Sequence, residues 1–166
     1  WGHACAIGVT YTNSVVGKIY CWGTNGDVNT DYRMTSVLSG DQYGTPQLMN
    51  TPSGATFKDI AMSNWTTCGI RSDGANDGTV YCWGYNNVGQ LGNGTVSGPT
   101  PASGVTPSVK PVAPSAIVQV TGPLASRKVI KISYGNDHFC AMTITGGSYC
   151  WGSNNHGQLG DGTTTD

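Results

Sequence analysis

The chain has 166 residues, a length that suits a single domain with a sizeable hydrophobic core. Only 10% of the residues are charged, glutamate is absent and 25 residues are glycine, which argues against a helical protein and favours strands joined by tight turns. The net charge of -1 argues against a nucleic-acid partner, because neutralising phosphates requires a basic patch. No run of about 18 apolar residues occurs, so the sequence predicts no membrane-spanning segment.

The first predicted elements are a strand at 3–7 and a second strand that ends in Tyr20-Cys21-Trp22-Gly23. The same tetrapeptide returns at 81–84 and at 149–152, each time with another cysteine upstream, which indicates internal duplication. After the first copy, the loop at 24–31 differs from the loops that follow the other two copies. The chain begins inside a repeat and without a signal peptide, so we expect either a processed protein or an internal piece of a longer one.

The second and third repeats each contain three predicted strands and a closing loop rich in glycine and asparagine. In the second repeat the strands span 57–63, 67–70 and 79–84, and the loop spans 85–95. In the third repeat the strands span 129–133, 138–144 and 148–152, and the loop spans 153–163.

The six cysteines are predicted to form one disulfide within each repeat. Each pair of cysteines is centred on turn residues, and strands that leave a turn place equidistant residues opposite each other at a distance that suits a disulfide. A zinc site fits less well: His3 and His138 each precede a cysteine by two residues, but the second repeat has Thr66 there. Disulfides indicate an oxidising compartment. The predicted bonds are Cys5–Cys21, Cys68–Cys82 and Cys140–Cys150.

The repeats resemble a known family through two strings of residues. One is Gly135-Asn136-Asp137-His138-Phe139-Cys140-Ala141-Met142, and the other is Tyr-Cys-Trp-Gly-x-Asn-Asn-x-Gly-Gln-Leu-Gly-(Asp/Asn)-Gly-Thr, which occurs in the second and third repeats. Together they resemble the regulator of chromosome condensation repeat. The resemblance is closest to the disulfide-bearing version of bacterial extracellular proteins and crinkly-type plant receptor kinases.

This resemblance implies an all-β fold of propeller blades, each a sheet of four antiparallel strands. It also implies that Trp22, Trp83 and Trp151 are structural core residues packed between blades. The repeats are expected at about 1–56, 57–128 and 129–166, with insertions at 24–56 and 96–128. Three repeats are too few to close a propeller. We therefore expect either a segment of a longer propeller or chains that complete each other's blades.

Other candidate sites are weaker. Asn64 and Asn93 begin possible N-glycosylation sequons. Alternating oxygen ligands make the segment around 25–31 a weak calcium candidate, although Thr30 and Ser36 stand where a calcium loop needs glycine and glutamate. Its possible ligands are Asn25, Asp27, Asn29 and Asp31.

No catalytic residue, resident metal or cofactor is predicted, because the three histidines and the aspartates form no acid/base couple. The leading function is therefore a non-catalytic extracellular scaffold for protein–protein interaction, secreted or on the cell surface. It could assemble with copies of itself into a fibre or surface structure, giving a homo-oligomer or filament. The alternatives are a segment of a closed propeller that binds a distinct protein partner, or a secreted hydrolase or lectin-like module.

Overall fold

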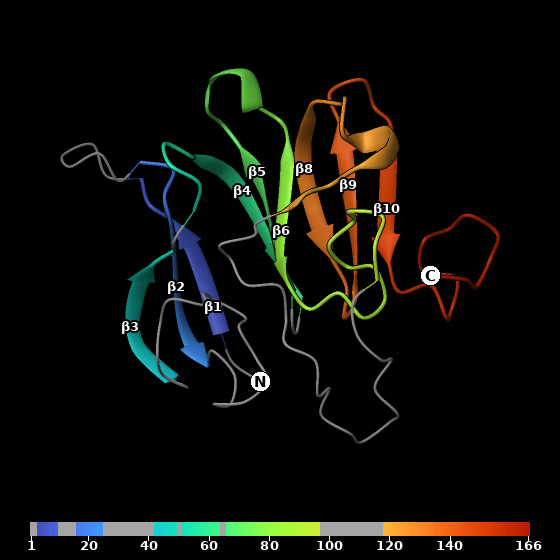
Figure 1. The fold of residues 1–166 in the computed structure, drawn as a ribbon, viewed down its shortest axis with the longest axis horizontal. Coiled ribbons are helices and arrows are strands. Elements are labelled where there is room, and N and C mark those ends of the chain that lie inside the picture. Colours follow the sequence, from blue (N-terminus) through green and yellow to red (C-terminus); the bar gives the residue numbers. More distant parts are fainter. Residues whose placement is uncertain (1–2, 10–15, 25–41, 50, 64–65, 97–117) are drawn as a thin grey trace.

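Residues 3–9, 16–24, 42–49, 51–63, 66–96 and 118–166 are described by the structure, a computed structural model. They form three antiparallel β-sheets that stand side by side in chain order (Figure 1). The prediction of an all-β, propeller-type array of about three repeats is confirmed. The helical segments among the described residues are the short 3₁₀ turns η1 (Gly74–Asn76) and η3 (Gly122–Leu124), and neither could cross a membrane.

The sheets follow the three repeats. Sheet 1 contains β1 (His3–Ile7), β2 (Ile19–Thr24) and β3 (Gln42–Leu48). Sheet 2 contains β4 (Phe57–Met62), β5 (Thr66–Arg71), β6 (Val80–Gly84) and β7 (Val118–Gln119). Sheet 3 contains β8 (Val129–Tyr134), β9 (His138–Thr143) and β10 (Ser148–Gly152). In each sheet the strands lie in chain order from one edge to the other.

Two strands lie in the ranges that the sequence suggested were insertions. In sheet 1, β3 pairs with β2 across a register shift, and in sheet 2 the short β7 pairs with β6. Neither segment carries a clear strand signal, since β3 contains Gly44 and Pro46 and β7 has only two residues. Each becomes a strand because it follows the free edge of a neighbouring strand.

All three disulfides are present in the structure, with the pairing given by the sequence. Each joins residues that are directly opposite each other on adjacent antiparallel strands, with a Cα–Cα distance of 4.1 Å. The described chain holds no free cysteine. The bonds are Cys5–Cys21, Cys68–Cys82 and Cys140–Cys150.

One glycine in the hairpin of sheet 1 and one in the hairpin of sheet 2 connect each of these sheets to the next sheet in the chain. The carbonyl oxygen of Gly17 accepts a hydrogen bond of 2.7 Å from the amide of Phe57, and Gly78 does the same for Val129 at 2.9 Å. Both glycines have a positive φ, 76° and 88°. A Cβ at Gly17 would lie 2.6 Å from Thr56 Cβ, and one at Gly78 would lie 2.5 Å from Lys128 Cγ. Only glycine allows this backbone conformation and this close approach together.

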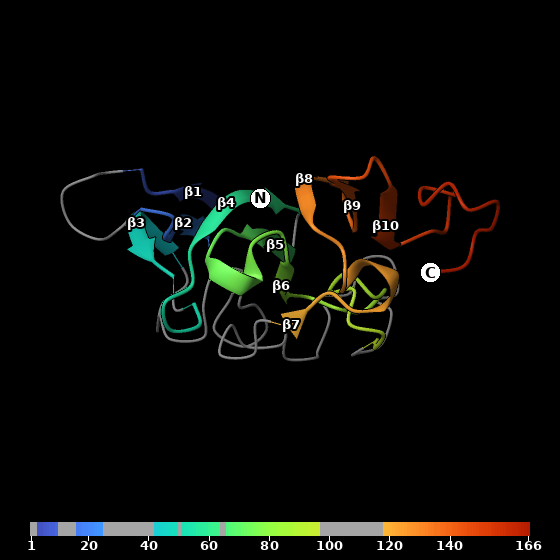
Figure 2. The same cartoon turned by 90° about the horizontal axis from the view of Figure 1, so that it is seen from above.

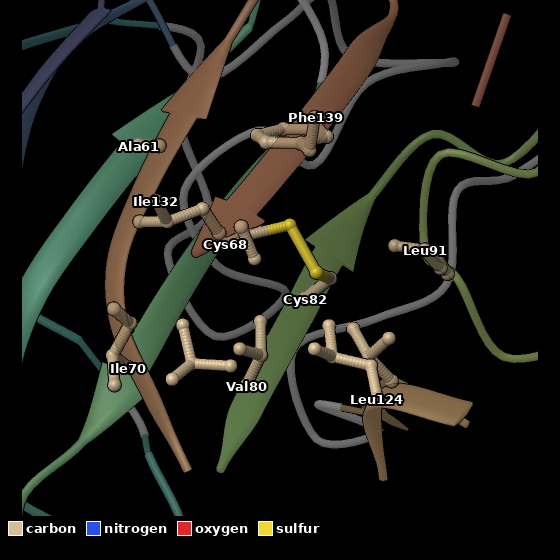
Figure 3. Close-up of a cluster of buried hydrophobic side chains, with 12 residues drawn as sticks. Ala61, Cys68, Ile70, Val80, Cys82, Leu91, Leu124, Ile132 and Phe139 are labelled. Carbon is tan, nitrogen blue, oxygen red and sulfur yellow. A yellow bond between two sulfur atoms is a disulfide. The ribbon is translucent and has the colours of Figure 1, made fainter. Parts of the chain in front are cut away.

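The hydrophobic core consists of two clusters, one at each junction between sheets. The first joins sheets 1 and 2 and contains Ile19, Cys21, Met49, Ala55, Phe57 and Trp83. The second is larger, joins sheets 2 and 3, and includes Ile70, Val80, Leu124, Val129 and Phe139 (Figure 3). Seen from above, the sheets stack face to face along the row (Figure 2), so that each junction buries one face of each neighbour.

A charged cluster fixes the hairpin of sheet 2. The Arg71 side chain donates to Asp73 from Nε at 2.8 Å and lies over the Tyr81 ring. Asp73 also accepts from the amide of Thr56 and from the side chain of Asn76, both at 3.2 Å. These hydrogen bonds, that of Arg71 above all, lower the pKa of Asp73 to about 2. The ionised carboxylate therefore ties the hairpin to the segment before β4.

Protonating Asp73 should destabilise the fold. Because its pKa falls on folding, Asp73 contributes stability above about pH 4, and this contribution is lost as the pH falls toward 2. With the side chain 23% exposed, we expect a loss of about 1–2 kcal/mol in the free energy of unfolding. Urea unfolding of the wild type and Asp73→Asn at pH 2–6 measures it.

The variant should be less stable than the wild type at pH 6, and the difference should shrink near pH 2. Asp77→Asn is the control, because the half-buried Asp77 carboxylate is paired with two lysines, Lys58 and Lys128, whose side chains are 33% and 48% exposed. Its effect at pH 6 should be smaller than that of Asp73→Asn. An Asp73→Asn protein as stable as the wild type at pH 6 would contradict this account.

Candidate interaction site

The disulfides of sheets 1 and 2 lie on the sheet face that meets the next sheet in the chain. Cys21 of sheet 1 belongs to the cluster that contains Trp83 of sheet 2. Cys68 and Cys82 of sheet 2 are fully buried against residues of sheet 3, among them Phe139 (Figure 3). The disulfide-bearing face of sheets 1 and 2 is therefore an interface.

The corresponding face of sheet 3 is exposed. Ile70, two residues after Cys68, is fully buried, whereas its counterpart Met142 is 44% exposed. Ile144, two residues further along the same strand direction, is 62% exposed. Ser148 replaces the buried Val80. We call the surface formed by Met142, Ile144, Ser148 and the Cys140–Cys150 disulfide the outer face of sheet 3.

The tryptophans of the repeated tetrapeptide differ in their surroundings. Trp83 is fully buried between sheets 1 and 2, with its ring edge-on to Phe57 at 6.5 Å. Trp151 is partly buried, stacks on Phe139 at 5.9 Å and packs against the second cluster. Trp22 is half-buried. Trp83 and Trp151 thus pack at the junctions between neighbouring sheets.

The loop of repeat 2 holds Trp151 of repeat 3. The indole nitrogen of Trp151 donates to the backbone carbonyl of Gln90 at 2.9 Å, and a Cβ at Gly92 would lie 2.9 Å from the ring. The Gln90 side chain also hydrogen-bonds Asp137 of repeat 3. Burial raises the pKa of Asp137, and the bond from Gln90 opposes this shift. The junction therefore combines ring packing with polar contacts.

One asparagine organises each of the two matching loops. Asn86 is 1% exposed; its Oδ1 accepts from the amide of Leu91 at 2.9 Å and its Nδ2 donates to the carbonyl of Thr95 at 2.9 Å. Asn154 makes the same contacts in repeat 3, with Leu159 and Thr163. The polar side chains of this motif are occupied with loop structure.

The other polar side chains of the two loops also form hydrogen bonds within their own loop. Gln90 and Gln158 each accept from a backbone amide two residues earlier and donate to the preceding asparagine, Asn87 or Asn155. Asn93 accepts from the amide and hydroxyl of Thr95, and Asp161 accepts the same two bonds from Thr163. An aspartate can therefore replace Asn93 in this role.

The remaining predicted candidates are placed as follows. The calcium candidates and Asn64 lie outside the described residues. Within the described ranges, no three His, Cys, Asp or Glu side chains are grouped to hold a metal ion. His156 is exposed, and one of its ring nitrogens lies 2.7 Å from Asn155 Oδ1.

A pocket of about 430 Å³ lies between the loop of repeat 2 and sheet 3. Strand β10 of sheet 3 contributes Cys150, Trp151 and Gly152, and the loop that follows it contributes Leu159. The opposite wall includes Val88, Gly92, Gly94 and Thr121. This pocket could not be predicted from the sequence, because its walls come from segments far apart in the chain. The outer face of sheet 3 was equally hidden, although aligning Met142 with Ile70 could have found it.

Sheets of this connectivity, stacked in a row and joined through hairpin glycines and loop asparagines, define a propeller-type repeat protein. Solved propellers share this fold. They include Prp20p from Saccharomyces cerevisiae (20% identity, TM-score 0.66, covering 99% of this chain and 34% of that one) and human WBSCR16 (23%, 0.60, 90% and 33%).

The chain belongs to the family of the regulator of chromosome condensation (RCC1) repeat. Two models of this repeat match it, one over 57–90 and 129–158 and the other over 77–142. Among curated relatives, the human E3 ubiquitin-protein ligase HERC2 is 28% identical over 178 residues, and the rat probable E3 ubiquitin-protein ligase HERC4 is 24% identical over 163 residues. The alignments cover 100% and 98% of this chain but only 3% and 13% of those proteins.

The asparagines of the repeat 2 loop should tolerate the same substitution very differently. Asn86→Asp replaces a buried donor with a carboxylate facing the Thr95 carbonyl, so we expect a loss of about 2–3 kcal/mol in unfolding free energy. Asn93→Asp is the matched control and should change stability by less than about 0.5 kcal/mol, because Asp161 fills that role in repeat 3. Urea unfolding at pH 7 measures both, and equal effects would refute the assignment.

Proposed function

We propose that the chain is a non-catalytic extracellular scaffold for protein–protein interaction that binds its partner through the outer face of sheet 3. The observation that carries this proposal is the repetition of one surface. The disulfide-bearing face is buried against a neighbour in sheets 1 and 2, while in sheet 3 it exposes Met142 and Ile144. Exposed apolar surface on a β-sheet face is typical of an interaction site.

The extracellular assignment rests on the three disulfides, which are compatible with an oxidising compartment. N-glycosylation at Asn93 is also compatible with the loop. The contacts described for Asn93 use its Oδ1, and Asp161, which lacks an amide nitrogen, makes the same contacts. The repeats assigned to 1–56, 57–128 and 129–166 each contribute one sheet to this scaffold.

The similar solved propellers support a protein as the partner. One structure of yeast Prp20 is a complex with Kap60. A second structure of this protein is described together with its binding properties to Gsp1p and histones. These are protein partners, and a protein partner also suits a chain with a net charge of -1. The ligase relatives match over a small share of their length, so their activity is not part of this proposal.

Within the scaffold function, a copy of the same chain is the first candidate partner, which would give an oligomer or fibre. A distinct protein is the second candidate. The apolar character of the outer face favours self-association, because apolar residues predominate in the buried core of homodimer interfaces.

Ile144→Asp should weaken self-association. A charge at this 62% exposed position would have to be desolvated in the interface, so we expect at least about a tenfold increase in the dissociation constant. Sedimentation velocity over a concentration series measures it, and negative-stain microscopy distinguishes fibres from discrete particles. Val9→Asp is the matched control, since Val9 is 73% exposed and follows β1 of sheet 1, which lies at the opposite end of the row of sheets (Figure 1). A chain that stays monomeric throughout would contradict the self-assembly proposal.

A further inference from the structure

Two buried polar atoms lie on the face of sheet 2 that meets sheet 1. They are the hydroxyl oxygen of Thr67 and the indole nitrogen of Trp83, and both side chains are 0% exposed. Among the residues that the structure describes, neither atom has a hydrogen-bond partner. An unpaired buried donor or acceptor destabilises the folded state, so such atoms are nearly always bonded to protein or to ordered water.

The two atoms belong to one place inside the first junction. Thr67 of β5 is directly opposite Trp83 of β6 in the antiparallel register. Directly opposite residues have Cβ atoms about 4.5–5.5 Å apart and point to the same face of the sheet. That face meets sheet 1, because Trp83 packs with Ile19 in the first core cluster, whereas the adjacent Cys68 and Cys82 pack in the second.

The corresponding pair in sheet 3 is fully satisfied by protein atoms. Phe139 is directly opposite Trp151, and the two rings stack at 5.9 Å with an interplanar angle of 19°. The indole nitrogen of Trp151 donates to the carbonyl of Gln90 at 2.9 Å. The second junction therefore covers its tryptophan with a ring on one side and a carbonyl acceptor on the other.

Sheet 2 has neither of these two arrangements at Trp83. Its aromatic neighbour Phe57 comes from β4 and meets the indole edge-on, at 6.5 Å and 68°. A Cβ at Gly69 would lie 2.8 Å from Phe57 Cδ1, so the Phe57 ring lies over Gly69. On one face of a strand, Gly69 is about 6–7 Å from Thr67. The position opposite Trp83 therefore holds a small side chain with a hydroxyl, where sheet 3 holds a phenylalanine ring.

A water molecule matches the chemistry of this position. The indole N–H is a donor only, whereas a hydroxyl can both donate and accept. A water can accept from the first and exchange a hydrogen bond with the second, and two polar partners meet the minimum for a buried water. The adjacent Thr66 shows the contrast, because its equally buried hydroxyl donates directly to the carbonyl of Tyr85 at 2.8 Å.

We propose that one ordered water molecule binds at the junction between sheets 1 and 2, where it accepts from Trp83 Nε1 and hydrogen-bonds the Thr67 hydroxyl. This water takes the role that the Gln90 carbonyl has at the second junction. The first junction is thereby hydrated, whereas stacked rings and a direct bond close the second. The site is independent of the outer face of sheet 3, on which the proposed scaffold function depends.

Thr67→Val tests the site through stability, because valine keeps the shape of threonine and removes the hydroxyl. The variant loses a buried hydrogen bond to the water, so the equilibrium constant for unfolding of the complete chain should rise about fivefold. A hydroxyl without any partner gives the opposite sign, because valine then relieves a buried polar atom. Urea unfolding at pH 7, followed by circular dichroism, measures the constant.

Thr66→Val is the matched control. It breaks the direct bond to the Tyr85 carbonyl and should raise the unfolding constant at least as much. An unfolding constant for Thr67→Val that is equal to or lower than that of the wild type would overturn the proposal.

A crystal structure that shows ordered water tests the site directly. We expect a water oxygen within about 3.2 Å of both Trp83 Nε1 and Thr67 Oγ1, and none bonded to Trp151 Nε1, whose hydrogen bond goes to Gln90. A protein acceptor on Trp83 Nε1, or no water beside Thr67, would overturn the proposal and leave the scaffold function untouched.

Discussion

The stacking of one sheet on the next is the constraint on which the rest of this molecule depends. A sheet of three or four strands that is apolar on both faces cannot bury enough surface alone, so each repeat is stable only against a neighbour. The hairpin glycines make the stacking close enough, since the Gly78 carbonyl accepts from Val129 at 2.9 Å where any side chain would collide with Lys128. The second core cluster then forms around Ile70, Val80 and Phe139.

The loops after the tetrapeptide extend the same dependence to polar groups. Asn86 folds its loop so that the Gln90 carbonyl can receive the indole of Trp151 from the next repeat. The loop motif therefore recurs in repeats 2 and 3 because the fold requires it. Its side-chain amides form their hydrogen bonds inside the loop or at the junction between sheets. Chemistry specific to a partner has to come from positions at which the repeats differ, such as Val88 and His156, or Ile70 and Met142.

The parts of the fold that depend on nearby residues in the chain could be predicted from the sequence. The symmetric placement of the cysteines about a turn gave the disulfides, and the tetrapeptide located β2, β6 and β10. The strands β3 and β7 could not be predicted. One contains a proline and the other has only two residues, so each forms only because a neighbouring strand offers it an edge to pair with. Nor could the Asp73 cluster be predicted, because its partners include Thr56 from before β4. The pocket escaped for the same reason, since Thr121 and Trp151 meet only after the sheets have stacked.

Sheet 3 therefore carries a face whose counterparts in the other two sheets are buried. Met142 is exposed at the position of Ile70, which sheet 3 covers in sheet 2, and the exposed Ile144 lies two residues further along the chain. Apolar area of this kind attracts a flat apolar surface. Because the same face of sheets 1 and 2 is already occupied by the next sheet, sheet 3 is the one of the three that leaves it open to a partner.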